Sequence, residues 1–170
     1  MRSLRVIAIA ADRPSPRGLD LEQGVCARAV LRHGHQAMTR VLVVEDDLSV
    51  GAAIQMILGR EGCETVHASD AGVGIRAFES SRFDLAIIDI FLPDISGLKT
   101  IAELRRQAPT VPILAMSGFM FRDSMDPVLD YFAMATQAGA AACLRKPFAP
   151  RQLMAAVHAS LASAFSVAAF

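Results

Sequence analysis

The feature that most constrains the fold of this chain is a regular alternation, from residue 39 onward, of short apolar runs and longer segments with helical spacing. The first run, residues 41–44, consists of valine and leucine alone, which is typical of a strand that is buried on both faces. Residues 48–60 then carry apolar side chains three and four positions apart, and Gly59 and Gly62 mark the end of that segment. The pattern predicts a buried strand followed by a helix that covers it.

The same alternation continues to the end of the chain. Further strands are predicted at residues 65–68, 83–90, 111–116 and 141–145, and further helices at residues 71–80, 98–107, 127–138 and 151–164. Asp126 is the expected N-cap of the fourth helix, with Pro127 in its first turn. Five strands that alternate with five helices indicate βαβ units and an open, doubly wound parallel sheet. In such a sheet, ligands bind beyond the carboxyl ends of the strands.

Polar residues of chemically useful types follow four of the predicted strands. The acidic run Glu45–Asp47 follows the first strand, Asp89 lies at the end of the third, Ser117 follows the fourth and Lys146 follows the fifth. Because the carboxyl ends of parallel strands meet at one edge of the sheet, we expect these side chains to converge there.

Several carboxylates at one edge repel each other, and each then resists ionisation. A divalent cation such as Mg²⁺ removes the conflict, because it prefers oxygen ligands and keeps several waters. Such a cation can also neutralise the oxygens of an incoming phosphoryl group. Asp89 is then the expected nucleophile, which would form an aspartyl phosphate. Lys146 would place a point charge on the phosphoryl oxygens, and the Ser117 hydroxyl would complete the site.

Four segments, taken together and in order, resemble the signature segments of response-regulator receiver domains. They are VLVVEDD at residues 41–47, DIFLPDISG at 89–97, ILAMSG at 113–118 and KPF at 146–148. The resemblance covers about residues 40–165. It implies a flavodoxin-like α/β fold, in which five helices surround a five-stranded parallel sheet of strand order 2-1-3-4-5.

Carried over residue by residue, the resemblance implies that Asp89 is the phosphoacceptor and that Glu45 and Asp46 form the acidic pair that holds Mg²⁺. It implies that Asp89 also ligates the metal and that Phe91 lends it a backbone carbonyl. Asp47 is expected to begin the following helix, so metal binding should depend on Asp46 more than on Asp47.

Ser117 matches the switch hydroxyl of the family and Lys146 matches its lysine. The resemblance also makes Lys146–Pro147 a candidate cis peptide bond. This chain departs from the family pattern three residues before the lysine, where Cys143 replaces the usual switch aromatic. The segment between Ser117 and Lys146 is also longer than usual, and we expect the excess in a loop at residues 119–126.

The function that the resemblance implies is that of a cytoplasmic receiver in a two-component system. It would take a phosphoryl group from a sensor histidine kinase or a histidine phosphotransfer protein, and signal by protein–protein contact or onward relay. A homodimer on phosphorylation is compatible with this function. No enzymatic activity is expected beyond the receiver's own phosphorylation and dephosphorylation.

Two alternatives stay open. Mg²⁺-dependent phosphatases of the haloacid dehalogenase kind also form an aspartyl phosphate, but they carry a second aspartate two residues after the nucleophile, where this chain has Phe91. The second alternative is a pseudo-receiver that never takes phosphate. Such a protein would not need to keep the acidic pair together with Asp89 and Lys146.

Charge and cysteine content exclude several other classes. Lys plus Arg and Asp plus Glu both number 17, so the net charge is zero and direct nucleic-acid binding is not expected. We expect no effector domain after the receiver, and therefore a stand-alone protein. No apolar stretch is long enough to cross a membrane. The three cysteines form neither a zinc pattern nor a disulfide framework, as expected in a reducing cytoplasm.

The composition and periodicity of the sequence divide the chain into three parts. Residues 1–38 are expected to be an extension that is either disordered or absent from the native product, because translation can start at Met38. Residues 39–166 form the receiver, and residues 167–170 a short tail. The extension carries prolines, glycines and arginines without a long apolar face, so a chain that begins at Met38 should fold and be phosphorylated normally.

Aromatic residues near the site suggest two further properties. Phe119, Phe121, Tyr131 and Phe132 belong either to the core or to a partner-binding surface beside the fourth helix. In the family, the positions of Phe91 and Phe119 flank the approach of the hydrolytic water. Two rings cannot orient a water, so slow self-dephosphorylation is expected, while Gly118 leaves room for a partner histidine.

Overall fold

The central sheet of the protein has five parallel strands. The computed structural model describes residues 31–32, 35–36, 38–118 and 131–167. The strands are β3 (Arg40–Val44), β4 (Glu64–Ala68), β5 (Leu85–Asp89), β6 (Ile113–Ser117) and β7 (Ala142–Arg145). Their spatial order is β4-β3-β5-β6-β7, which confirms the order 2-1-3-4-5 when these five are numbered along the chain.

Five helices alternate with these strands. They are α1 (Leu48–Arg60), α2 (Ala71–Ser80), α3 (Gly97–Gln107), α4 (Tyr131–Ala138) and α5 (Pro150–Val167). The bounds of α1 and α2 are those predicted, whereas α5 extends further at both ends than its predicted range of 151–164. The predicted start of α4 at Asp126 and Pro127 lies outside the described residues.

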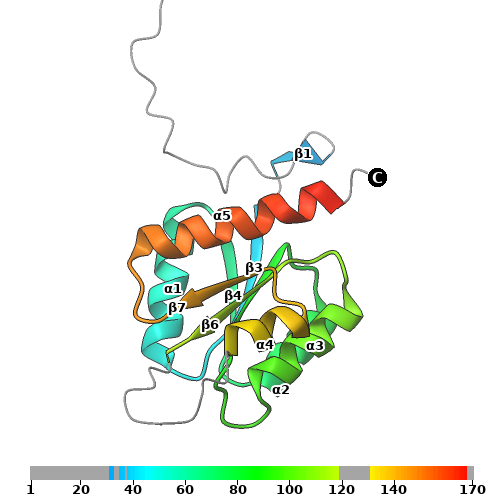
Figure 1. The fold of residues 1–170 in the computed structure, drawn as a ribbon. Helices are drawn as coiled ribbons and strands as arrows, with labels where there is room; N and C mark the ends of the chain where they lie inside the picture. Colours follow the sequence, from blue (N-terminus) through cyan, green and yellow to red (C-terminus); the bar gives the residue numbers. More distant parts are fainter. Residues whose placement is uncertain (1–30, 33–34, 37, 119–130, 168–170) are drawn as a thin grey trace, which may run out of the picture.

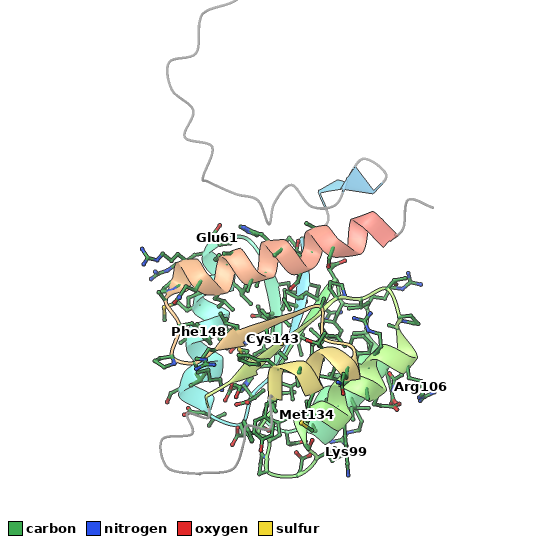
Figure 2. All side chains as sticks on the ribbon, in the orientation of Figure 1. Glu61, Lys99, Arg106, Met134, Cys143 and Phe148 are labelled. Atoms are coloured by element: carbon green, nitrogen blue, oxygen red, sulfur yellow. The ribbon has the colours of Figure 1, made fainter. Side chains whose placement is uncertain are left out.

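The helices form two layers on the faces of the sheet (Figure 1). Val41 and Val43 of β3 pack with residues of α1 and α5, among them Ile54 and Leu153. The residues between and after them on β3 point to the other face, where they meet side chains of α2, α3 and α4. All four residues 41–44 are fully buried, which explains why this strand is apolar without interruption. The sticks of Figure 2 fill the space between the sheet and both helical layers.

Two aspartates mark helix starts in the sequence. Asp47 caps α1, since its Oδ1 accepts from the backbone N–H groups of Ser49 at 2.8 Å and Val50 at 3.2 Å. Asp70 caps α2 and accepts from the N–H of Val73 at 2.7 Å. The cap at Asp47 matters for function, because it places α1 directly behind the acidic run at the end of β3.

The N-terminal region contributes a feature that the sequence did not predict. β1 (Leu31–Arg32) and β2 (His35–Gln36) pair antiparallel, separately from the main sheet. That residues 1–38 are dispensable stays a prediction. Among the described residues, no helix has both the length and the apolar character that a membrane crossing requires.

Candidate functional site

The sheet register brings the predicted site residues to one edge. Val44 of β3 pairs with Ile88 of β5, so the next residues, Glu45 and Asp89, leave the two central strands at the same level. On the other side, β6 and β7 pair through Ser117 and Arg145. The N–H of the following residue, Lys146, donates to the Ser117 carbonyl at 2.8 Å. Strand-end residues from β3, β5, β6 and β7 therefore share one end of the sheet.

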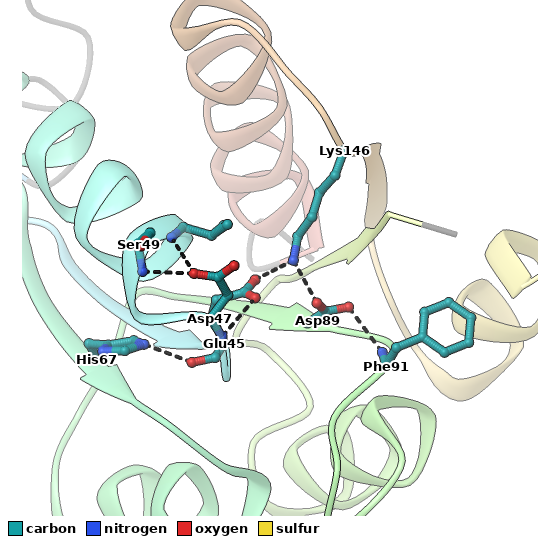
Figure 3. A network of polar contacts seen from close by, with 8 residues as sticks. Glu45, Asp47, Ser49, His67, Asp89, Phe91 and Lys146 are labelled. Carbon is teal, nitrogen blue, oxygen red and sulfur yellow. Dashed lines mark hydrogen bonds and ion pairs between the residues drawn. The ribbon is translucent and has the colours of Figure 1, made fainter. Parts of the chain in front are cut away.

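Lys146 joins two of the acids directly. Its Nζ donates to Glu45 Oε2 at 2.5 Å and to Asp89 Oδ2 at 2.6 Å, as Figure 3 shows. Glu45 has only 1% of its surface exposed and Asp89 only 6%, so both carboxylates lie away from bulk water. The ammonium thus bridges the buried ends of the two central strands.

Asp46 completes the acidic cluster. One carboxylate oxygen each from Glu45, Asp46 and Asp89 lie within 4.8 Å of one another. Asp46 is exposed while the other two are buried, so the cluster has one side open to water. This donor set fits Mg²⁺, which takes oxygen ligands and keeps several waters. Asp47 does not belong to the cluster, because its carboxylate caps α1.

The electrostatics of the acidic cluster favour an added positive charge. Burial raises the pKa of the Glu45 carboxyl, and this effect exceeds the opposing hydrogen bond from Lys146. Burial would lower the pKa of Lys146, but hydrogen bonds to Asp89 and Glu45 reverse that effect and raise it. Both groups therefore hold their protons more tightly than usual. Three carboxylates facing one ammonium leave a negative excess that a divalent cation can balance.

Phe91 connects the phosphoacceptor candidate to α4. Its backbone N–H donates to Asp89 Oδ1 at 2.9 Å, so both oxygens of Asp89 have a donor. The Phe91 ring meets the Tyr131 ring edge to face, with ring centroids 4.9 Å apart. The role of the Phe91 carbonyl as a metal ligand stays a prediction.

Ser117, Cys143 and the Lys146–Pro147 bond are the remaining predicted features that the structure describes. Ser117 is buried at the end of β6, and the Lys146–Pro147 peptide bond is cis, as predicted. Cys143 on β7 is half-buried. Its Sγ lies 3.8 Å from the carbonyl oxygen of Phe132, which places it against α4 (Figure 2). Phe119 and Phe121 lie outside the described residues.

Three supporting residues were not predicted. His67 on β4 places its Nε2 2.8 Å from the Glu45 backbone carbonyl oxygen. Gly97 begins α3 so close to Asp89 that a Cβ on it would lie 1.9 Å from the Asp89 carbonyl oxygen. Asp94 accepts from the first two N–H groups of α2, each at 3.2 Å, and so ties the loop after β5 to that helix. For His67 the available signal was its place at the end of the strand that pairs with β3.

The family model of the response regulator receiver domain matches residues 41–158. The alkaline phosphatase synthesis transcriptional regulatory protein PhoP of Bacillus subtilis is 32% identical over 122 residues, which are 72% of this chain and 48% of that protein. The DNA-binding response regulator MtrA of Mycobacterium leprae is 33% identical over 122 residues, covering 72% and 51%. The chain therefore spans about half the length of these curated relatives.

Solved structures agree with the sequence comparison. A CheY-like response regulator receiver domain protein from Methanospirillum hungatei superposes with a TM-score of 0.69 at 28% identity, over 77% of this chain and 99% of that one. The chemotaxis protein CheY4 of Vibrio cholerae gives a TM-score of 0.66 at 25% identity, over 73% and 99%. The matched residues 41–158 include all four strand ends that meet at this edge of the sheet, and this chain belongs to the response regulator receiver domain family.

Proposed function

We propose that this protein is a cytoplasmic phosphoacceptor that takes a phosphoryl group on Asp89 from a sensor histidine kinase or a histidine phosphotransfer protein, with Mg²⁺ as its cation. The observation that carries the proposal is the contact of Lys146 Nζ with both Asp89 and Glu45 beside the open side of the acidic cluster. A lone structural ion pair would not need a third carboxylate at its exposed side.

The residues of the pocket divide the work of the transfer. A carboxylate oxygen of Asp89 attacks phosphorus, the bond from phosphorus to the donor histidine nitrogen breaks, and the imidazole leaves. Lys146 already lies 2.6 Å from Asp89 Oδ2, so a small movement brings its ammonium to a phosphoryl oxygen. The Phe91 N–H holds the other oxygen and orients the carboxylate. Mg²⁺, held by Glu45, Asp46 and Asp89, would neutralise charge on the phosphoryl oxygens.

The charge of the phosphorylated product also requires Lys146 and a cation beside Asp89. An aspartyl phosphate carries about −1.5 to −2 charge units in place of a single carboxylate charge. Buried carboxylates alone would oppose that gain, whereas an ammonium within hydrogen-bond reach and a cation at the open side offset it. We infer that Asp89 accepts phosphate only with both positive charges present.

The test is labelling with acetyl phosphate and Mg²⁺, followed by mass spectrometry of the intact chain. Wild type should gain one phosphoryl group, and Asp89→Asn should gain none, since the amide oxygen is a poor nucleophile. Asp47→Asn is the matched control, because Asn also caps helices well and the residue lies outside the cluster. Equal labelling of wild type and Asp89→Asn would refute the proposal.

We assign no separate enzymatic activity. A phosphatase would need an acid or base beside the acyl phosphate, and the position of the second phosphatase aspartate holds Phe91, whose ring packs on Tyr131. The chemistry left is the protein's own phosphorylation and slow self-dephosphorylation. A pseudo-receiver predicts no labelling at all, so the same experiment separates it from the leading function.

We propose that α4 forms the signalling surface of the protein. The phosphorylated protein would signal by contact with a protein partner, by relay or by forming a homodimer. Phe91 touches Asp89 with its amide and Tyr131 of α4 with its ring. The DNA binding in the names of some relatives is a property of those proteins, and no nucleic-acid contact is assigned to this receiver. Gel filtration with and without beryllofluoride tests the homodimer.

A further inference from the structure

We propose that His67 is a positioning residue of the cation site, which holds the peptide between Glu45 and Asp46 through a hydrogen bond to the Glu45 carbonyl. The inference rests on the proposed function, because it assumes that the acidic cluster binds Mg²⁺. His67 Nε2 lies 2.8 Å from the Glu45 carbonyl oxygen (Figure 3). A carbonyl only accepts, so Nε2 carries the proton in this contact.

The contact comes from the strand next to the acids. β4 pairs with β3 in parallel, with His67 level with Val43 and Ala68 level with Val44. The Glu45 N–H donates to the Ala68 carbonyl at 3.0 Å. With His67 on its carbonyl, Glu45 has both of its backbone polar groups held by the end of β4. The peptide that joins Glu45 to Asp46 is therefore fixed just beyond the last pair of residues in the β3–β4 ladder.

Gly51 on α1 makes room for the ring. A Cβ at residue 51 would lie 2.5 Å from His67 Nε2 and 2.8 Å from His67 Cε1, closer than any real side chain allows. Glycine inside a helix is less favourable than alanine, so its presence at this position needs a local reason. The imidazole sits where only glycine leaves space for it, so the Gly51 position and the His67 hydrogen bond serve one arrangement.

The His67 hydrogen bond should matter more for the orientation of the Asp46 carboxylate than for that of Glu45. Lys146 and burial already fix the Glu45 carboxylate, whereas Asp46 is exposed. If the peptide before Asp46 could rotate, its carboxylate would have to be ordered each time a cation bound. Partners that orient metal ligands by hydrogen bonds typically change metal affinity about 10–100-fold when removed. We expect the lower end of that range, because only one of three acids is affected.

The experiment is a Mg²⁺ titration of the full chain, read from Mn²⁺ competition and from thermal unfolding, for three proteins. His67→Leu removes the donor and should weaken Mg²⁺ binding about tenfold. His67→Gln keeps an N–H at a similar reach and should bind within about threefold of wild type. Thr65→Val is the control, since it lies on the same face of β4 away from Glu45 and should leave the affinity unchanged.

Unfolding measured without Mg²⁺ reports how much each substitution changes the stability of the protein itself. It therefore separates a packing role of His67 from its role in positioning the cation site. Gly51→Ala should weaken Mg²⁺ binding like His67→Leu, although the imidazole stays, because the new methyl displaces the ring. Wild-type affinity in His67→Leu overturns the inference, even if that variant is less stable. Equal loss in His67→Leu and His67→Gln also overturns it, because the ring's shape and not its N–H would then matter. If wild type itself ignores Mg²⁺, the metal site of the proposed function fails, and His67 loses its role with it.

Discussion

Asp46→Asn should make the protein more stable without Mg²⁺ and less stable with it. The substitution removes one negative charge from a cluster in which three carboxylates face a single ammonium. It keeps the size of the side chain, and Asp46 is exposed, so little packing changes. The two opposite effects come from one cause, since the negative charges that repel one another without Mg²⁺ are what attract the cation.

The magnitude follows from the distances. Two unit charges 4.8 Å apart repel by about 0.9 kcal/mol in water, and the clustered oxygens lie at or below that distance. Asp46 faces two such neighbours, and attraction to Lys146 offsets about one of the two repulsions. Asp46→Asn should therefore raise the free energy of unfolding by about 1 kcal/mol, which raises the melting temperature by about 2–4 °C. At a Mg²⁺ concentration of about 100 times the Kd, wild type gains about 2.7 kcal/mol. The variant loses most of that gain.

The assay is thermal and urea unfolding in EDTA and in Mg²⁺, with Asp47→Asn as the matched control. The control makes the same chemical change one residue away, where the side chain caps α1 and Asn can keep the cap. Its Mg²⁺ response should equal that of wild type. A full Mg²⁺ response in Asp46→Asn with none in Asp47→Asn would show that the ligand is the neighbouring residue. A loss of stability in EDTA for Asp46→Asn would refute the repulsion.

Three further predictions concern the surroundings of Asp89. Gly97→Ala should lower the free energy of unfolding by about 3 kcal/mol in urea, because its Cβ would lie 1.9 Å from the Asp89 carbonyl oxygen. Gly59→Ala, with nothing within 4 Å, should be neutral or stabilising, and equal effects would contradict the contact. Tyr131 is the one tyrosine in a chain without tryptophan, so beryllofluoride with Mg²⁺ should change its fluorescence in wild type but not in Phe91→Leu. Phe91→Asn should speed decay of the phosphorylated form several-fold by orienting water, and an unchanged rate would exclude shielding by the ring.

The site could be predicted because parallel topology alone fixes where strand ends lie. Asp89 and Lys146 are far apart in sequence, yet Asp89 ends one strand of the sheet and Lys146 directly follows another, and their atoms come within 2.6 Å. The distinction between Asp46 and Asp47 was also predictable, because the second acid stands where a helix cap belongs. These inferences need only periodicity and the position of a residue relative to a strand end.

The supporting contacts could not be predicted, because each depends on atoms brought together by packing. The place of His67 at the end of its strand did not reveal its contacts, since its partner is a backbone carbonyl and its neighbour is a glycine on α1. Gly97 ends the motif at residues 89–97, just before the predicted helix, and that pattern does not reveal its closeness to the Asp89 carbonyl. Asp94 lies in a loop, and its bonds to the N–H groups of α2 depend on how that loop folds back.

The contact between Phe91 and Tyr131 also limits how far phosphorylation alone can shift the conformation of α4. Cys143 occupies the place of the family's aromatic and lies 3.8 Å from the Phe132 carbonyl, so no ring can turn inward there. Phe91 offers another route, because an acyl phosphate is a weaker acceptor than the Asp89 carboxylate, and its N–H can then turn to a phosphoryl oxygen.

An edge-to-face aromatic pair contributes about 0.5–1.5 kcal/mol beyond its buried area. Loss of that contact changes a two-state equilibrium by about twofold to about tenfold, whereas a change from 1:99 to 99:1 takes about 5.5 kcal/mol. Phosphorylation through this route alone should therefore shift α4 only in part. Tyr131 should report two populations after beryllofluoride, and one population only once a partner adds its own binding energy at α4. A complete shift of Tyr131 in the isolated chain would mean that other contacts carry most of the signal.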